Sequence, residues 1–240
     1  MGDCRRGRGR QGARHLQPTS RGLYRALQSV HEDEPGHAVD VADVEFWESI
    51  YAAGTPPWDQ AAPAPPLVRV IEETELPAHA RVFVPGCGFG HEALWLAAHD
   101  YHVTAVDFAP AAIEGLRYRA QAAGVAIDVI EADVFDLPTE LGGGFDALVE
   151  HTCFCAIDPH RRHDYARIAA QLLGHAGVLL GLFFEVAGTI EEGPPFPTTR
   201  SDIIRHFEPA FEINRIEQPE DSFSRRQGRE WLASMRRREI

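Results

Sequence analysis

The fold of this 240-residue chain is decided by the stretch Val82-Phe83-Val84-Pro85-Gly86-Cys87-Gly88-Phe89-Gly90, followed by Val103-Thr104-Ala105-Val106-Asp107. A short apolar, β-branched run leads into a glycine-rich turn, and a second apolar run ends on a carboxylate 17 residues after the last glycine. Glycine lets a backbone turn sharply and approach a ligand closely, because it has no Cβ. The carboxylate is placed to accept hydrogen bonds from both hydroxyls of a ribose. The two runs therefore predict a nucleoside-binding α/β domain.

The spacing of the glycines indicates which nucleoside is bound. A dinucleotide site prefers G-x-G-x-x-G, with the N-terminus of a helix aimed at a pyrophosphate. Here the pattern is G-x-G-x-G over residues 86–90. It is more typical of S-adenosylmethionine (SAM) sites, which hold no pyrophosphate, and it disfavours a dehydrogenase. A non-catalytic regulator that binds SAM or a nucleotide in the same cleft remains an alternative.

The length and composition restrict the classes of protein to consider. A chain of 240 residues suits one domain of ordinary size. The best candidate for a membrane span, residues 177–184, is only eight residues long and stops at Glu185, so it is interpreted as a buried strand. All 23 basic residues are arginine. A chain without lysine excludes Schiff-base and lysine general-base mechanisms.

The charge is unevenly distributed along the chain. Residues 1–30 hold seven arginines and one acid, whereas the remainder holds 16 arginines and 35 acids. An acidic body argues against nucleic-acid binding, which normally needs a basic face. Residues 1–30 lack apolar periodicity, and residues 1–38 are predicted to be a disordered basic extension. We expect an inert extension or a misassigned start, rather than a targeting peptide or a tail for RNA or anionic surfaces.

The cysteines and histidines point to neither disulfides nor a metal. The four cysteines show no disulfide-framework spacing, which favours a reducing, cytoplasmic setting: Cys4, Cys87, Cys153 and Cys155. We expect Cys153 and Cys155 to alternate on a strand end and face the same side, as ordinary buried cysteines rather than redox or metal residues. His160 and His163 have no matching pair of ligands elsewhere, so no metal site is expected.

Predicted strands and helices alternate along most of the chain. The strands are expected at residues 81–84, 102–107, 126–131, 145–152, 178–184, 211–218 and 230–237. The helices are expected from residue 43 to the turn at 54–59, and at 67–74, 90–99, 110–123, 159–173 and 200–207, with an irregular proline-rich loop at 63–66. Repeated β-α units require a parallel sheet, because a parallel return needs a crossover helix.

Four of these predicted strands end on polar or glycine residues. Gly86, Asp107, Asp133 and His151 follow the first four strands in order, and ligands of an open parallel sheet collect at that edge. The alternative interpretations are that Asp107 is the N-cap of the next helix and that Asp133 is a turn residue. An acid at Asp133 would suit the exocyclic amine of adenine.

Five short stretches resemble the thiopurine/thiol/halide methyltransferase family. In order, they are Phe46-Trp47-Glu48-Ser49-Ile50-Tyr51, Thr55-Pro56-Pro57-Trp58-Asp59-Gln60, residues 84–92 around the glycine turn, Phe154-Cys155-Ala156-Ile157-Asp158-Pro159, and Gly193-Pro194-Pro195-Phe196. The resemblance covers roughly residues 44–235. It implies a single-domain class I methyltransferase at 39–240, an α/β, Rossmann-like fold with a mostly parallel seven-stranded sheet flanked by helices. It also implies SAM as methyl donor, released as S-adenosylhomocysteine, and we expect a monomer.

The resemblance carries over to particular residues. Trp47, Tyr51 and Trp58 resemble an aromatic trio that closes over SAM, faces the cationic sulfonium and excludes water. The alternative is that Trp47 and Tyr51 only fasten the N-terminal helix to the sheet. By position, Gly86 corresponds to the glycine that the methionine moiety approaches and Asp107 to the ribose ligand. The pair that flanks adenine corresponds to Asp133 and Val134.

The acceptor end departs from the family. His151 stands where the plant halide/thiol branch has tyrosine and the thiopurine branch has arginine. The thiopurine branch also has a substrate-facing arginine near the C-terminus, where this chain carries Arg225, Arg226 and Arg229. We expect most of these three to be solvated.

The expected activity is transfer of the SAM methyl group to a small soft nucleophile: a thiol, sulfide, thiopurine or halide. Such an in-line displacement depends mainly on alignment of the reacting atoms. A thiolate needs little base assistance and a halide needs none. If a thiol enters protonated, His151 is the available base, because histidine changes charge near neutral pH. His151 is also expected to contact the cofactor.

Overall fold

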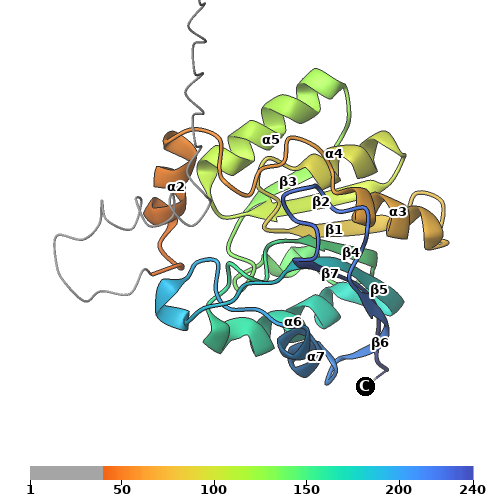
Figure 1. The fold of residues 1–240 in the computed structure, drawn as a ribbon. Coiled ribbons are helices and arrows are strands. Elements are labelled where there is room, and N and C mark those ends of the chain that lie inside the picture. Colours follow the sequence, from red (N-terminus) through yellow and green to blue (C-terminus); the bar gives the residue numbers. More distant parts are fainter. Residues whose placement is uncertain (1–39, 240) are drawn as a thin grey trace, which may run out of the picture.

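The structure is a computed structural model that describes residues 40–239, so the predicted basic extension at 1–38 lies outside the described residues. Its centre is a seven-stranded sheet with the strand order β3-β2-β1-β4-β5-β7-β6 (Figure 1). The strands are β1 (Arg81–Pro85), β2 (His102–Asp107), β3 (Asp128–Glu131), β4 (Phe145–His151), β5 (Leu173–Phe184), β6 (Phe211–Glu217) and β7 (Glu230–Arg237).

The direction of the strands decides what lies at each edge of the sheet. Strands β1 to β5 run parallel, so their carboxyl ends meet at one edge. Strand β7 is inserted between β5 and β6 and runs antiparallel to both. Its first residue, Glu230, pairs with Phe184, the last residue of β5. The loop before β7 is therefore brought to the edge where the parallel strands end.

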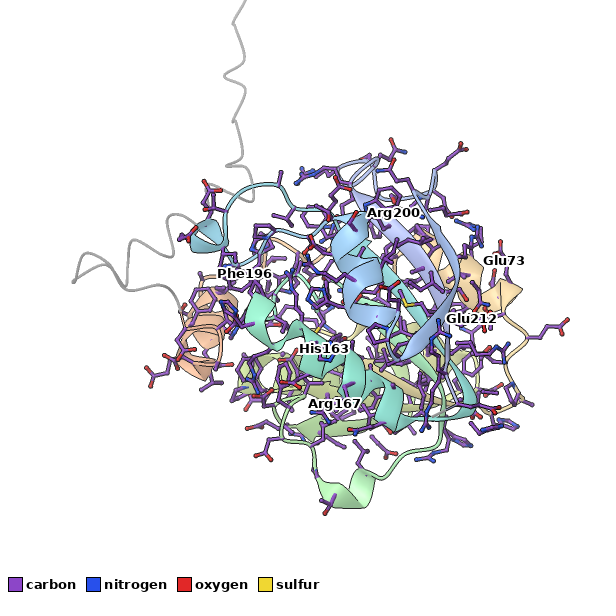
Figure 2. All side chains as sticks on the ribbon, turned by 90° about the horizontal axis from the view of Figure 1, so that it is seen from below. Glu73, His163, Arg167, Phe196, Arg200 and Glu212 are labelled. Atoms are coloured by element: carbon purple, nitrogen blue, oxygen red, sulfur yellow. The ribbon has the colours of Figure 1, made fainter. Side chains whose placement is uncertain are left out.

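Helices cover both faces of the sheet. They are α2 (Val44–Ala52), α3 (Pro65–Glu73), α4 (His91–Ala98), α5 (Pro110–Ala123), α6 (Arg162–Leu172) and α7 (Arg200–Phe207). Helices α3, α4 and α5 cover one face, α6 and α7 cover the other, and α2 packs against α5 (Figure 1). The view from below looks onto α6, which carries Arg167, and onto α7, which begins at Arg200 (Figure 2). Three short 3₁₀ helices lie in the connections: η1 (Thr139–Leu141), η2 (Pro159–Arg161) and η3 (Ile190–Glu192).

The core lies in two layers, one on each side of the sheet. Under α6 and α7 it is rich in buried aromatic rings: Phe83, Phe145, Phe154, Tyr165, Phe183, Phe207 and Phe211. Under α3 and α4 it is mainly aliphatic: Leu67, Val70, Ile71, Val82, Leu96, Leu180 and Leu182. Burial of a side chain of this kind is worth roughly 1.5–3 kcal/mol. No helix within residues 40–239 has the length and apolar character needed to cross a bilayer.

The structure confirms the alternation of strands and helices, with four main differences. The expected helix at 159–173 is divided into the 3₁₀ helix η2 and the helix α6, which begins at Arg162. Helix α3 begins at Pro65 rather than Leu67, because proline fits the first turn of a helix. Strand β5 begins at Leu173 rather than Val178, where Leu173 pairs with Phe145 ahead of an irregularity in the β4–β5 register. The expected strand at 126–131 is confined to β3 at Asp128–Glu131.

The expected placement of two cysteines is wrong. Strand β4 ends at His151, and Thr152 then adopts a φ of +63°, which ends the extended conformation. The following turn is closed by the Ala156 N–H, which donates to the Cys153 carbonyl at 2.9 Å. Cys153 and Cys155 therefore lie in a turn and do not alternate along a strand.

Candidate active site

A cleft of about 1500 Å³ lies at the edge where the parallel strands end. A typical small-molecule pocket measures roughly 300–1,000 Å³, so this cleft has room for more than one small molecule. The structure brings all the predicted site residues to its wall: Trp47, Tyr51, Trp58, Gly86, Asp107, Asp133, Val134 and His151.

The glycine turn after β1 forms the floor of the cleft. Gly86 and Gly88 both have a φ of +53°, a conformation that glycine adopts without strain. A Cβ at Gly86 would lie 2.7 Å from the Cys153 sulfur. The turn is held to the next strand because the Cys87 N–H donates to the Val106 carbonyl at 2.9 Å. Residue 86 therefore has no room for a side chain beside Cys153.

Asp107 holds the glycine turn at the end of β2. Its Oδ2 accepts from the Gly88 N–H at 2.9 Å, and its Oδ1 accepts from the Ala109 N–H at 3.0 Å. Burial raises the pKa of Asp107, and these N–H donors oppose the rise. The N-cap of α5 is Ala109 and not Asp107. Because each carboxylate oxygen can accept more than one hydrogen bond, both remain able to accept from ribose hydroxyls.

Asp133 has the turn contact that its alternative interpretation requires. Its Oδ1 accepts from the Phe135 N–H at 2.9 Å, and its Oδ2 lies 3.8 Å from Nη1 of Arg161. The Arg161 guanidinium lies 3.6 Å from the centre of the Phe135 ring. The contact of Asp133 and Val134 with adenine stays a prediction.

The aromatic trio forms one wall of the cleft. Trp47 and Tyr51 both meet Trp58 edge to face, with ring centres 5.7 and 5.8 Å apart, and Tyr51 meets Phe89 at 5.1 Å. Trp47 is 8% exposed and also contacts Phe108 beyond β2. The trio thus lines the cleft while it fastens α2 to the body of the protein.

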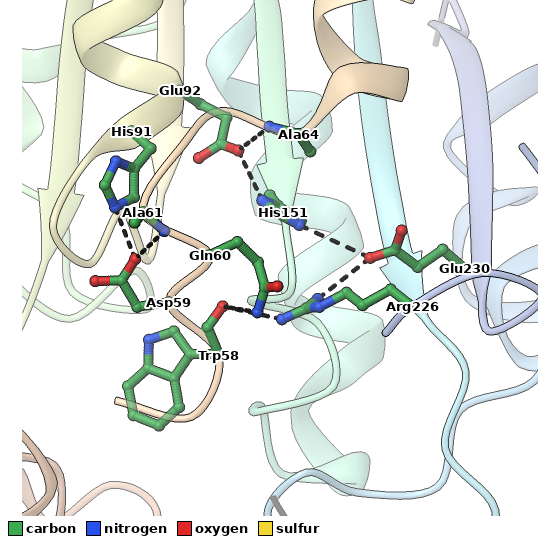
Figure 3. A network of polar contacts seen from close by, with 10 residues as sticks. All are labelled: Trp58, Asp59, Gln60, Ala61, Ala64, His91, Glu92, His151, Arg226 and Glu230. Carbon is green, nitrogen blue, oxygen red and sulfur yellow. Dashed lines mark hydrogen bonds and ion pairs between the residues drawn. The ribbon is translucent and has the colours of Figure 1, made fainter. Parts of the chain in front are cut away.

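His151 is held by a buried glutamate on a neighbouring helix. Its Nδ1 lies 2.7 Å from Oε1 of Glu92 in the first turn of α4, and the same oxygen accepts from the Ala64 N–H at 3.1 Å (Figure 3). Burial raises the pKa of Glu92, but the charge and hydrogen bond of His151 together with the Ala64 N–H outweigh it and lower the pKa to about 2. An ionised carboxylate only accepts hydrogen bonds, so Nδ1 carries the proton.

The other ring nitrogen of His151 faces a second buried glutamate. Nε2 has no hydrogen-bond partner among the described residues and lies 3.9 Å from Oε1 of Glu230, whose side chain is fully buried. That oxygen accepts from Nη1 of Arg226 at 3.2 Å, and Nη2 of Arg226 donates to the Trp58 carbonyl at 3.0 Å. Figure 3 shows this series of contacts from Glu92 to Trp58.

Sequence reasoning did not assign roles to Glu92, Arg226 or Glu230. Glu92 stood directly after the glycine turn, in a stretch already noted for its resemblance, and that was its only signal. Arg225 and Arg229 are exposed as expected, whereas Arg226 is buried. Its burial depends on the antiparallel insertion of β7, which no local pattern encodes.

A second anchor fixes the segment that covers the cleft. Residues 55–62, which we call the covering segment, all line the cleft. Oδ1 of Asp59 lies 2.8 Å from Nε2 of His91, the first residue of α4, and accepts from the Ala61 N–H at 2.6 Å. Consecutive residues of α4, His91 and Glu92, therefore hold the covering segment and His151 (Figure 3).

Two thiols, those of Cys153 and Cys155, line the cleft close to the buried carboxyl of Glu150. Burial raises the pKa of Glu150 to about 7, although the Phe154 N–H donates to its Oε1 at 2.8 Å. Burial likewise raises the pKa of Cys153, and that of Cys155 to about 12, so these thiols stay protonated. Within the part of the chain that the structure describes, no group of three or more His, Cys, Asp or Glu side chains could hold a metal ion.

The arrangement combines a cleft that is large enough for a nucleoside and a second small molecule with a basic nitrogen, Nε2 of His151, that has no hydrogen-bond partner among the described residues. The glycine turn, Asp107 and the aromatic trio offer a backbone floor, a carboxylate and ring faces, which suit a cationic nucleoside such as SAM. Beside them, His151 presents Nε2 in a form able to accept a proton.

Comparison with known proteins gives a consistent result. The profile of the thiopurine S-methyltransferase family matches residues 42–239. The chain is 30% identical over 190 residues to thiocyanate methyltransferase 1 of Brassica oleracea, covering 78% of this chain and 82% of that protein. It is 31% identical over 189 residues to probable thiol methyltransferase 2 of Arabidopsis thaliana, with the same coverage.

A solved structure supports the fold. The 1,6-didemethyltoxoflavin-N1-methyltransferase of Burkholderia thailandensis, with bound S-adenosylhomocysteine, matches with a TM-score of 0.67 at 19% identity. The match covers 86% of this chain and 93% of that one. At this identity, the likeness establishes the class I methyltransferase fold alone, in agreement with the strand order.

Proposed function

This chain belongs to the thiopurine S-methyltransferase family and is a SAM-dependent methyltransferase, and on that premise we propose that it methylates a small thiol in the cleft, with His151 as the general base. Membership of an enzyme family argues against the non-catalytic regulator considered above. The names of the relatives, a thiocyanate and a probable thiol methyltransferase, support a soft sulfur acceptor.

The residues of the cleft fit SAM as the methyl donor. When bound, SAM supplies a methyl group on a positively charged sulfur. Gly86 and Gly88 leave backbone room that a Cβ would reduce, and Asp107 can accept from the ribose hydroxyls. Asp133 and Val134 also line the cleft, which supports their proposed contact with adenine. The aromatic trio excludes water from the reacting atoms and offers ring faces to a cation.

The observation that carries the proposal is the free nitrogen of His151. Glu92 fixes the proton on Nδ1, so the lone pair of Nε2 is available. In the proposed reaction, the acceptor sulfur forms a bond to the methyl carbon while the donor keeps the electron pair of the broken carbon–sulfur bond. The thiol proton passes to Nε2. Glu92 and Glu230 then stabilise the imidazolium from its two sides.

The test is methyl transfer from labelled SAM to a panel of acceptors by the purified protein. The panel contains small thiols, hydrosulfide, thiocyanate, thiopurines and halides. We expect labelled thioether from at least one thiol. A protein that binds SAM but methylates no sulfur acceptor would contradict the proposal, whereas methylation of thiocyanate or halide alone would remove the need for a base.

A further inference from the structure

Arg226 lies between the covering segment and the carboxylate that faces His151. Its side chain is only 7% exposed, which is unusual for arginine, and its guanidinium lies 4.9 Å from the centre of the Phe184 ring. One nitrogen, Nη2, donates to the Trp58 carbonyl, and the other, Nη1, donates to Glu230 (Figure 3). A single guanidinium therefore joins Glu230 to a backbone segment that lies 168 residues before Arg226 in the sequence.

Glu230 depends on positive charge from its neighbours. Its side chain is fully buried, and its Oε2 has no hydrogen-bond partner among the described residues. A buried carboxylate is costly unless it is paired. The permanent partner is Arg226, because guanidinium does not lose its proton in proteins. His151, 3.9 Å away, becomes a second partner only when Nε2 is protonated.

The same arginine holds the backbone of the aromatic wall. The Trp58 carbonyl accepts from Arg226 at 3.0 Å and from the Gln60 side chain at 3.3 Å. Trp58 in turn contacts both Trp47 and Tyr51. A movement of Arg226 would therefore displace Trp58 and, through its ring contacts, affect the other two rings of the aromatic trio.

Two cations that share one carboxylate repel each other. A proton on Nε2 would place an imidazolium next to Oε1 of Glu230, the oxygen that already accepts from Nη1 of Arg226. The other charged groups near the His151 ring are Glu92 from α4 and Glu150, which precedes His151 on β4. Both are acids, so Arg226 is the cation whose position opposes protonation of His151.

We propose that Arg226 is a positioning residue that couples the covering segment to His151 through Glu230, so that the segment is held most firmly while His151 is neutral. This inference rests on the proposed function of the site. The proton that leaves the thiol would arrive on Nε2, weaken the hold of Arg226 on the Trp58 carbonyl, and loosen the segment for product release. Because such coupling is reciprocal, removal of Arg226 must also ease protonation of His151.

The test follows His151 and the covering segment separately, without an acceptor. His151 is titrated by NMR in ¹³C-histidine-labelled protein, with its signal assigned by its loss in His151→Gln. The segment is followed by S-adenosylhomocysteine affinity and by protection of residues 55–62 from protease. In Arg226→Gln we expect the titration midpoint of His151 to rise by roughly one pH unit. We also expect the affinity for S-adenosylhomocysteine to fall by roughly tenfold or more, because the hydrogen bond from the charged Arg226 to the Trp58 carbonyl is lost.

Arg226→Lys separates the two effects. Lysine restores the charge beside Glu230 but lacks the planar fork that reaches two partners, so the midpoint should return while the affinity stays low. Arg229→Gln is the matched control, because Arg229 lies over the same Phe184 ring at 4.6 Å but is exposed. It should keep the wild-type midpoint and protease protection.

An unchanged midpoint in Arg226→Gln would overturn the proposal, and so would equal effects of both Arg226 variants on both measurements, since that would indicate packing alone. If Arg226→Gln does not fold, Arg226→Lys decides: low affinity with a wild-type midpoint supports the coupling, and wild-type affinity contradicts it. Neither measurement uses a methyl acceptor, so a failure of the proposed thiol activity is seen independently.

Discussion

Nδ1 of His151 lies 2.7 Å from Oε1 of Glu92, which joins the carboxyl end of β4 to the first turn of α4. Both side chains are 12% exposed. The contact fixes which nitrogen of the ring carries the proton, and it leaves Nε2 as the basic atom at the end of the cleft where we propose that the acceptor binds. In the proposed mechanism, Glu92 orients the ring of His151 so that Nε2 acts as the base.

His151→Gln should lower thiol methylation by the roughly 10²–10⁴-fold typical of a general base. Glutamine can still donate to Glu92 but cannot take a proton, so SAM affinity should be nearly unchanged. A halide or thiocyanate ion has no proton to lose, and its methylation by the variant should fall much less. The measurement is the ratio of thiol to halide turnover in both proteins. An unchanged ratio would show that His151 only packs in the site.

Glu92→Gln should reduce kcat for a thiol by about tenfold to a hundredfold. The reason is the loss of a charge-assisted hydrogen bond, worth roughly 1.5–3 kcal/mol, that orients and stabilises the base. The KM for SAM should change little, because SAM is expected to be held by the glycine turn and Asp107, and Glu92 is not part of that contact. Steady-state kinetics show whether the substitution changes kcat for the thiol or KM for SAM. A change confined to KM would assign Glu92 to the cofactor instead.

Asp107→Ala should weaken SAM binding by about one to two orders of magnitude, since hydrogen bonds to a charged acceptor are worth roughly 1.5–3 kcal/mol. The carboxylate also holds the Gly88 N–H, so part of the loss comes from a looser glycine turn. Asp107→Asn keeps one oxygen acceptor, so its SAM affinity should lie between that of Asp107→Ala and that of the wild type. Calorimetry on folded proteins measures both. Equal affinity of Asp107→Ala and wild type would remove Asp107 from the cofactor site.

Glu150→Gln should stabilise the protein at alkaline pH. Burial raises the pKa of Glu150 from 4.5 to about 7, so between these values the folded chain holds a proton that the unfolded chain releases. Rising pH through this window therefore lowers the free energy of unfolding of the wild type, by on the order of 3 kcal/mol in total. Glutamine has no such proton, so the advantage of the variant should grow from pH 4.5 to pH 7 and then stay constant.

Urea unfolding at pH 5 and pH 8 measures this stability difference. Glu208→Gln, a substitution of the same kind at an exposed position, is the control and should show no comparable growth. A pH-independent difference for Glu150→Gln would mean that the buried carboxyl does not titrate in this window.

The sequence alone predicted the fold, and it predicted which strand ends meet at the edge where the cleft lies. Apolar runs of strand length, glycines at tight turns and acids at strand ends are local patterns. Their order along the chain predicted that Gly86, Asp107, Asp133 and His151 share one edge, and the structure places all four on the wall of one cleft. The predicted boundaries of helices and strands differ from the observed ones where local signals conflict, as at Pro65 and Leu173.

The contacts around His151 were decided only by the tertiary structure. Nothing near Glu92 in the sequence indicates that it meets a histidine 59 residues later, and Arg226 resembles its exposed neighbours Arg225 and Arg229. The antiparallel insertion of β7 brings Glu230 and Arg226 to the end of β4, between His151 and Trp58. Periodicity reports which face of an element is buried, but the partner of a buried charge is set by contacts between distant elements, which exist only once the sheet has formed.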